Sequence, residues 1–199
     1  MINLNDIFYT FQGEGYNAGR RALFIRVPYC NYSCPWCDTE YNSYDEWSLS
    51  DFRDVALSES SRFAVLTGGE PMMHKHSPMI ISELKELDFE IACETNGSRP
   101  ILDGIDYATV SPKKYVQKLL PEFFIHPHAE NNAGEFKYVV EEGFDFSILD
   151  RHDVTDGRKY YLSPEYNIFD ESLNRIHEYI KENPGWRISL QTHKIMNIK

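Results

Sequence analysis

Short runs of apolar and β-branched residues recur along the chain at intervals typical of buried strands. Seven such runs predict strands: Ala22–Val27, Phe63–Leu66, Phe89–Ala92, Tyr107–Val110, Phe136–Val140, Tyr160–Leu162 and Arg187–Leu190. Between several of them, apolar residues recur at spacings of three and four, which predicts helices over Leu49–Leu57, Ser77–Leu87 and Glu171–Glu182. Alternating strands and helices indicate a parallel sheet with right-handed crossovers.

Local signals define the ends of these helices. Ser48 or Ser50 is placed to cap the first helix, because a serine hydroxyl accepts hydrogen bonds from the N–H groups of a first turn. Pro78 suits the first turn of the second helix, and Asp170 is placed to cap the last. Residues 117–134 predict neither a helix nor a strand over their whole length, so we expect a loop with a partial helix there.

Polar and glycine-rich segments follow the predicted strands, one after each strand end. They are the cysteine loop (Cys30–Cys37), TGGEP (Thr67–Pro71), ETNGS (Glu94–Ser98), SPK (Ser111–Lys113), SPEY (Ser163–Tyr166) and QTHK (Gln191–Lys194). The carboxyl ends of parallel strands meet at one edge of a barrel or open sheet, where active sites form. The site is therefore predicted at that edge.

Composition limits the kind of molecule that this chain can be. With 199 residues, 42% of them hydrophobic, it can bury one core, so we expect a single domain over residues 1–199. A formal net charge of -11 argues against tight binding of a polyanion, so we expect a small-molecule substrate and no direct nucleic-acid partner. Residues 1–15 hold no basic leader and no apolar run has bilayer length, which predicts a cytoplasmic protein without membrane contact.

Three of the four cysteines lie in CNYSCPWC, where Cys30, Cys34 and Cys37 can converge on one metal centre. Soft thiolate ligands suit an iron–sulfur cluster or zinc. Three protein ligands leave one position open for a substrate or cofactor, whereas a structural zinc site needs four. The alternative is therefore zinc, with Cys93 or a histidine such as His74 as the fourth ligand. Because Cys93 lies in the apolar run FEIAC, we expect a small buried hydrophobe outside the site.

The CxxxCxxC loop after the first strand, paired with TGGEP after the second, resembles the radical S-adenosylmethionine (SAM) superfamily. That resemblance implies a 4Fe-4S cluster on the three loop cysteines, whose open iron binds SAM for cleavage to a 5′-deoxyadenosyl radical. Gly68 and Gly69 would let backbone carbonyls approach the SAM ammonium closely, and Glu70 would add a complementary charge. The SAM-binding residues implied are Trp36, Gly68, Gly69, Glu70, Asn96, Ser111 and Lys113.

Four further segments narrow the resemblance to the 7-carboxy-7-deazaguanine synthase family: FQGEG (Phe11–Gly15), FIR (Phe24–Arg26), CDT (Cys37–Thr39) and QTHK. That family implies an α/β fold, a partial (β/α)6 TIM-like barrel of the radical SAM type. It also implies a lyase reaction that converts 6-carboxy-5,6,7,8-tetrahydropterin to 7-carboxy-7-deazaguanine with loss of ammonia, in queuosine-type 7-deazapurine biosynthesis. A Mg2+ ion on Thr39 is implied as well, whereas the residues alone favour a helix or turn cap at Asp38 and Thr39.

The family resemblance also implies which side chains hold the pterin substrate. They are Gln12, Gly13, Glu14, Arg26, Thr95, Gln191 and His193. A pterin edge offers adjacent donors and acceptors, which Gln12, the Gly13 backbone and Glu14 can satisfy. Arg26 stands in an apolar strand, where an unpaired cation is costly, so we expect it to pair with a substrate carboxylate. The alternative is a salt bridge from Arg26 to an Asp or Glu of the protein.

Two competing functions fit parts of this pattern. A glycyl-radical activase is small and also uses CxxxCxxC and SAM, but it acts on a partner protein and has no use for FQGEG or CDT. A zinc-stabilised binding module explains the cysteines but leaves TGGEP, ETNGS and SPK without a role. From the family we further expect a homodimer, because an incomplete barrel leaves sheet edges to cover, and flavodoxin or ferredoxin as electron donor.

Overall fold

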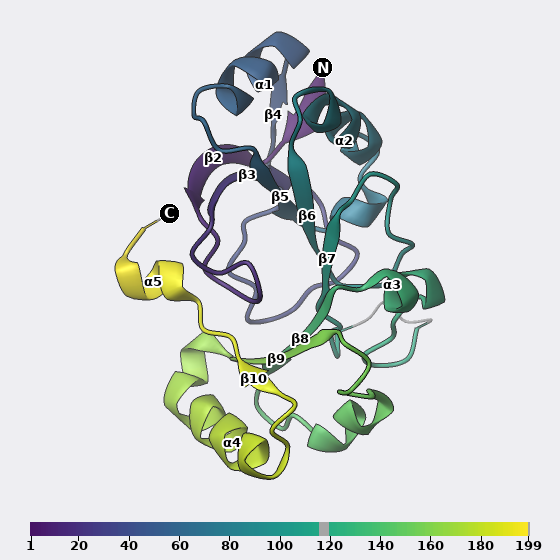
Figure 1. The fold of residues 1–199 in the computed structure, drawn as a ribbon, viewed down its shortest axis with the longest axis vertical. Helices are drawn as coiled ribbons and strands as arrows, with labels where there is room; N and C mark the ends of the chain where they lie inside the picture. Colours follow the sequence, from purple (N-terminus) through teal and green to yellow (C-terminus); the bar gives the residue numbers. More distant parts are fainter. Residues whose placement is uncertain (116–119, 199) are drawn as a thin grey trace.

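The computed structural model describes residues 1–115 and 120–198, where one curved sheet of eight strands carries the fold (Figure 1). In spatial order its strands are β10 (Arg187–Ile188), β9 (Lys159–Pro164), β8 (Glu135–Val140), β7 (Tyr107–Val110), β6 (Glu90–Thr95), β5 (Phe63–Gly68), β3 (Arg21–Val27) and β2 (Asp6–Phe11). Neighbouring strands run parallel, except that β2 is antiparallel to β3. A separate antiparallel pair joins β1 (Ile2–Leu4) to β4 (Asp45–Trp47).

Most helices of the described residues lie along the outside of the curved sheet, whereas the short last one lies beside the carboxyl edge, where its Lys194 pairs with Asp38 (Figure 1). The helices are α1 (Leu49–Ala56), α2 (Ser77–Glu86), α3 (Pro127–Asn132), α4 (Phe169–Glu182) and α5 (Thr192–Met196), together with the 3-10 turns η1 (Pro71–Met73), η2 (Phe146–Arg151) and η3 (Tyr166–Ile168). The sheet ends at β2 and β10 without closing, which confirms the α/β class and the partial barrel. Within the described chain, no helix is both long and apolar enough to cross a membrane.

All seven predicted strands are present, as β3 and β5 to β10, with ends shifted by up to three residues. The three predicted helices are present as α1, α2 and α4. Ser48 caps α1 by accepting a hydrogen bond from Asp51 N at 3.1 Å, and Pro78 lies in the first turn of α2. The predicted cap at Asp170 is wrong, because α4 already begins at Phe169 and Asp170 falls in its first turn.

Pattern reading missed the N-terminal strands β1 and β2 and the short strand β4. β2 has the sequence DIFYTF and ends in the FQGEG segment, and its burial alternates imperfectly because it lies at the edge of the sheet. Within the uncertain stretch 117–134, the structure has the expected partial helix as α3. Residues 116–119 of that neighbourhood lie outside the described residues.

Alternate residues of each strand face the inside of the barrel. The inward residues near the amino ends form a small apolar cluster of Ala22, Phe24, Phe63, Val65 and Ala92. The outward residues, such as Leu23 and Ile25, join the larger core, which also contains Phe52 of α1, Leu84 of α2 and Ile176 of α4. Toward the carboxyl ends the inward positions become polar. The inside of the barrel is therefore apolar near the amino ends of the strands and polar near their carboxyl ends.

Candidate active site

A cavity opens at the carboxyl edge of the sheet, where the sequence predicts the site. Its wall includes most of the predicted cluster, SAM and substrate residues: Glu14, Cys30, Cys34, Trp36, Cys37, Thr39, Gly68, Gly69, Thr95, Asn96, Ser111, Lys113 and Gln191. A smaller hollow beside it is lined by Gln12, Arg26 and His193. Glu14, Asp38, Thr39, Thr67, Glu94 and Gln191 line both hollows, so the two share one wall and lie side by side.

The cysteine loop leaves the end of β3 and turns its three thiols into this cavity. Tyr32 N donates to Cys30 Sγ at 3.4 Å, and Cys37 N donates to the Cys34 carbonyl at 3.1 Å, which fixes the turn between the ligands. Burial raises the pKa of the Cys30 thiol, and it raises the pKa of Cys34 to about 11 despite the nearby Lys113. A cationic metal centre would offset that penalty and stabilise the thiolates.

The donor set in the cavity wall includes three cysteine thiols, which suit an iron–sulfur cluster with one open iron. In the parts of the chain described, no three His, Cys, Asp or Glu side chains stand close enough to hold one ion. A cluster binds each thiolate through a different iron, so its ligands stand further apart than those of zinc. Cys93, the zinc ligand considered above, is fully buried in the outward-facing core instead, and His74 is absent from the cavity wall.

The TGGEP segment packs closely against the backbone at the start of the cysteine loop. A Cβ atom at Gly69 would overlap the Tyr29 carbonyl oxygen, and one at Gly68, whose φ is 115°, would overlap the Val27 backbone. Both glycines therefore permit close contact between the end of β5 and the start of the cysteine loop. Gly69 N also donates to the Val27 carbonyl at 2.9 Å.

Glu70 lies beneath the cavity and is absent from its wall. Its fully buried carboxylate accepts hydrogen bonds from Thr95 Oγ1 at 2.7 Å, Asn96 N at 2.7 Å and Met72 N at 2.9 Å. Burial nevertheless raises its pKa above the ordinary value. The geometry thus differs from the expected charge contact with SAM: Glu70 ties TGGEP to ETNGS, and the Thr95 hydroxyl is engaged by it.

The Trp36 side chain of the cysteine loop is held from the opposite wall. Its Nε1 donates to Glu141 Oε2 at 2.5 Å, and Lys113 Nζ lies 5.0 Å from its ring centroid. Lys113 in turn donates to Ser111 Oγ at 2.6 Å, while burial lowers the pKa of its ammonium. Glu141, the residue after β8, was missed because an acidic stretch such as EEGFDF is expected to face solvent, whereas this carboxylate is buried.

Asn96 binds the cysteine loop from the β6 side. Its Nδ2 donates to Asn31 Oδ1 at 2.9 Å and lies 4.0 Å from Cys30 Sγ, and Asn31 Nδ2 donates to Ser98 Oγ at 2.9 Å. All three polar side chains are buried. The ETNGS segment therefore holds the first cysteine in place as well as lining the cavity.

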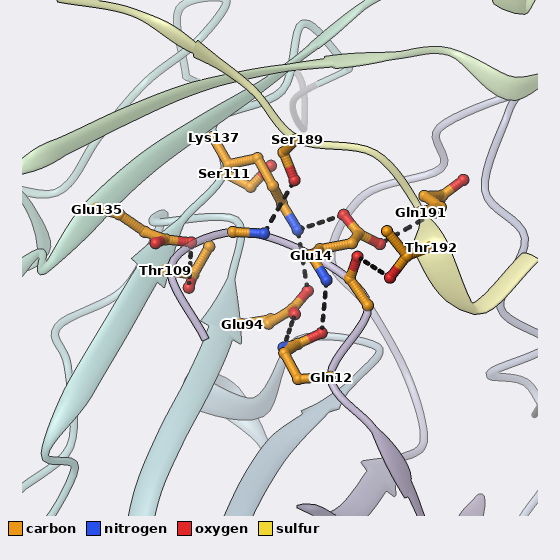
Figure 2. A network of polar contacts seen from close by, with 12 residues as sticks. Gln12, Glu14, Glu94, Thr109, Ser111, Glu135, Lys137, Ser189, Gln191 and Thr192 are labelled. Atoms are coloured by element: carbon orange, nitrogen blue, oxygen red, sulfur yellow. Dashed lines mark hydrogen bonds and ion pairs between the residues drawn. The ribbon is translucent and has the colours of Figure 1, made fainter. Parts of the chain in front are cut away.

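The FQGEG segment follows β2 and contacts the chain between β10 and α5, where Gly15 N donates to Ser189 Oγ at 2.9 Å (Figure 2). The Gly13 carbonyl accepts hydrogen bonds from Thr192 N at 3.1 Å and Thr192 Oγ1 at 2.9 Å. A Cβ atom at Gly13 would overlap the His193 ring, so glycine is needed where the two segments meet. Gly13 itself lies outside the cavity wall, and its observed role is to join FQGEG to QTHK.

Gln12 and Glu14 point into the site, where their side chains join a continuous polar network (Figure 2). Gln12 Nε2 donates to Glu94 Oε1 at 2.9 Å, and Gln12 Oε1 accepts from Glu14 N at 3.1 Å. Gln191 Nε2 donates to Glu14 Oε1 at 3.1 Å. Lys137 Nζ lies 2.7 Å from Glu14 Oε2 and 3.3 Å from Glu94 Oε2.

Glu94 and Lys137 are site residues that the sequence reading did not single out. Lys137 stands in the apolar run EFKYVV, so the reasoning applied to Arg26 would have found it. Glu94 is the first residue of ETNGS, at a strand end. Burial opposes the charge of Lys137, but Glu14 and Glu94 outweigh it and raise the Lys137 pKa. In the same way, burial would raise the Glu14 pKa, but Lys137 holds it below its ordinary value.

Arg26 and Thr39 meet between the two hollows. Arg26 Nη1 donates to Thr39 Oγ1 at 3.1 Å, and its guanidinium lies 5.6 Å from the Phe8 ring centroid. Asp38, next to Thr39, forms a 2.6 Å ion pair with Lys194 of α5. Burial would raise the pKa of Asp38, but Lys194 lowers it. The CDT segment is thereby joined to both β3 and the last helix.

Known proteins match this arrangement over the full length of the chain. Residues 24–122 match the profile of the radical SAM superfamily. The 7-carboxy-7-deazaguanine synthase of Haemophilus influenzae is 33% identical and the alignment covers 100% of this chain and 94% of the relative. The synthase of the same name from Synechocystis sp. is also 33% identical, covering 98% and 92%.

A solved structure agrees with the sequence comparisons. The crystal structure of QueE from Escherichia coli superimposes with a TM-score of 0.76 at 27% identity, over 94% of this chain and 92% of that one. On these grounds, the chain belongs to the 7-carboxy-7-deazaguanine synthase family of radical SAM enzymes.

Proposed function

We propose that this enzyme converts 6-carboxy-5,6,7,8-tetrahydropterin to 7-carboxy-7-deazaguanine with loss of ammonia, as a step of queuosine-type 7-deazapurine biosynthesis. The observation that carries the proposal is that two hollows share one wall: the three loop cysteines line one hollow, and Gln12 and Arg26 line the other. A cofactor held on the cysteines and a ring held on the FQGEG segment would therefore lie side by side.

When bound, the 4Fe-4S cluster and SAM would supply the radical that abstracts and returns a substrate hydrogen. The residues of this chain bind, orient and shield the reactants. Cys30, Cys34 and Cys37 would hold the cluster, and Trp36, Gly68, Gly69, Asn96, Ser111 and Lys113 would surround SAM. Glu70 would act indirectly, by fixing TGGEP against ETNGS.

For the substrate, Gln12, Glu14 and Gln191 offer polar groups to the pterin edge, and Arg26 offers a guanidinium to its carboxylate. Thr95 and His193 complete the walls, and Gly13 positions the segment between them. Because Arg26 occupies only one side of the Thr39 hydroxyl, that oxygen keeps a lone pair for a cation.

That lone pair supports Thr39 as a Mg2+ ligand, with substrate oxygens and waters filling the remaining positions. Chelation of divalent ions should then abolish turnover, and added Mg2+ should restore it. Thr39→Ser keeps the hydroxyl and should respond to Mg2+ in the same range as the parent enzyme, whereas Thr39→Val should need far more. Equal Mg2+ dependence of both variants would remove Thr39 from the proposal.

Three further features belong to the proposal through the family. The enzyme would work in the cytoplasm as a homodimer, with flavodoxin or ferredoxin as reductant. Light scattering measures the mass of the purified protein in solution and so tests the homodimer. A monomer at the concentration of the assay would contradict the homodimer. Turnover with each reduced carrier in place of dithionite tests the electron donor.

The decisive experiment is an anaerobic reaction of the reconstituted protein with SAM, dithionite, Mg2+ and 6-carboxy-5,6,7,8-tetrahydropterin. Mass spectrometry should detect 7-carboxy-7-deazaguanine. Cys34→Ala should abolish the product, and Cys93→Ala, which changes a buried cysteine outside the cavity, should retain it. Release of 5′-deoxyadenosine without the deazaguanine would refute the pterin substrate while leaving the SAM chemistry intact.

A further inference from the structure

Lys137 bridges two carboxylates that come from distant parts of the chain (Figure 2). Glu14 belongs to the FQGEG segment, Glu94 lies near the end of β6, and Lys137 lies on β8. The lysine side chain is 6% exposed, and the two glutamates are 15% and 25% exposed. One ammonium therefore joins two acids inside the polar part of the barrel.

The remaining oxygens of these carboxylates are also held. Glu14 Oε1 accepts from Gln191, and Glu94 Oε1 accepts from Gln12. Each acid thus has one oxygen on Lys137 and the other on a glutamine, which fixes the plane of both groups. A carboxylate oxygen accepts more than one hydrogen bond, so acceptor positions remain on the cavity side.

Two carboxylates that share one ammonium would repel each other if that ammonium were removed. In a partly buried site, one of them would then take up a proton to avoid an uncompensated charge. The other cations nearby are already engaged: Lys113 donates to Ser111, and Arg26 donates to Thr39. Lys137 is the lysine in direct contact with both acids.

We propose that Lys137 is a positioning residue that keeps Glu14 and Glu94 together as paired anionic acceptors, and so selects a ring edge bearing two adjacent N–H donors. A 2-amino-4-oxopyrimidine edge, as in pterins, has this donor pair. A 2,4-dioxopyrimidine edge, as in lumazines, puts a carbonyl oxygen where the amino group would be. This inference rests on the proposed function, because it deepens how the same site recognises its ring.

The test compares two stable competitive ligands, 6-carboxypterin and 6-carboxylumazine, on the SAM-loaded holoenzyme. The wild type should bind the pterin at least tenfold more tightly. In Lys137→Met this preference should fall below threefold, because a protonated acid can donate to the lumazine carbonyl. Lys137→Arg should restore most of the preference, since it returns the charge.

Substrate kinetics separate positioning from general damage. Lys137→Met should raise KM for the carboxytetrahydropterin at least tenfold, while SAM affinity stays within twofold. The matched control is Lys159→Met, at the amino end of β9, which removes a lysine charge outside both hollows and should change neither value. An unchanged pterin preference in Lys137→Met would overturn the inference.

A stability measurement keeps the inference testable even if Lys137→Met folds poorly. Adding Glu94→Gln removes one of the two repelling charges, so the double variant should unfold at a higher denaturant concentration than Lys137→Met alone. If Glu94→Gln instead destabilises Lys137→Met further, the inference that Lys137 holds two repelling acids together is contradicted. If the pterin preference is lost in Lys137→Met but the wild type forms no deazaguanine, the proposed reaction fails while the role of Lys137 stands.

Discussion

Replacing Glu70 tests whether this acid fixes the loops beneath the cavity or contacts SAM. Its carboxylate is fully buried and accepts three hydrogen bonds from Met72 N, Thr95 Oγ1 and Asn96 N, between 2.7 and 2.9 Å. Two of the donors are backbone amides, which lose this acceptor if the side chain is removed. Glu70→Ala therefore leaves a buried gap and unpaired donors at the ends of β5 and β6.

The magnitude follows from those contacts. Leaving a buried donor unpaired costs about 1–3 kcal/mol, so two orphaned amides and the lost Thr95 contact should destabilise Glu70→Ala by about 4 kcal/mol. Glu70→Gln keeps the shape and one acceptor oxygen but turns an NH2 group toward a donor, which should cost about 2 kcal/mol. For a chain of this size, 2 kcal/mol lowers Tm by roughly 4–8 °C.

Urea unfolding of the protein without SAM gives the free energy of unfolding for both variants. Equilibrium titration of the reconstituted protein then gives the SAM dissociation constant. If Glu70 fixes TGGEP against ETNGS, stability should fall in the order wild type, Glu70→Gln, Glu70→Ala. The SAM affinity of Glu70→Gln should stay within about threefold of wild type. If Glu70→Gln keeps the wild-type stability but loses much of its SAM affinity, the structural role is refuted and Glu70 is assigned to SAM binding.

Three other substitutions have expected outcomes. Gly69→Ala should push the Tyr29 backbone away and lower iron incorporation, measured as iron per chain after reconstitution. His152 stays neutral because burial lowers its pKa to about 4, so protonation of the unfolded chain below about pH 6.5 reduces stability as the pH falls. His152 should cost the wild type about 1–2 kcal/mol of unfolding free energy between pH 7 and pH 5, measured by urea unfolding. In His152→Gln this part of the pH dependence should be absent. Glu141→Gln should weaken the hold on Trp36 and change its fluorescence, while an unchanged spectrum would contradict that contact.

The strand and helix pattern gave most of the fold because buried parallel strands are continuous apolar runs. Strand ends then located the cysteine loop, TGGEP and ETNGS at one edge of the sheet, as the cavity confirms. The edge strand β2 and the pair of β1 with β4 were missed, since short or edge strands bury too few residues to show a clear period. Asp170 failed as a cap because its helix begins at Phe169, two residues earlier than predicted.

Side-chain roles were harder to derive than positions. Glu70 follows two glycines at a strand end, so its place in the sequence suggests the cavity, yet its carboxylate turns inward to backbone amides. The contact of Lys137 with both Glu14 and Glu94 joins residues more than forty positions apart, and no local pattern reports such a meeting. Family membership, in turn, decides against a zinc module and a glycyl-radical activase.

The most direct test of the account is the metal content of the reconstituted protein and of its cysteine variants. The three-cysteine loop predicts about four irons and about four sulfides per chain in the wild type. Cys93→Ala should retain that content and Cys34→Ala should lose it. A protein that holds zinc, or whose iron content is unaffected by Cys34→Ala, would contradict the assignment of the loop as the cluster site.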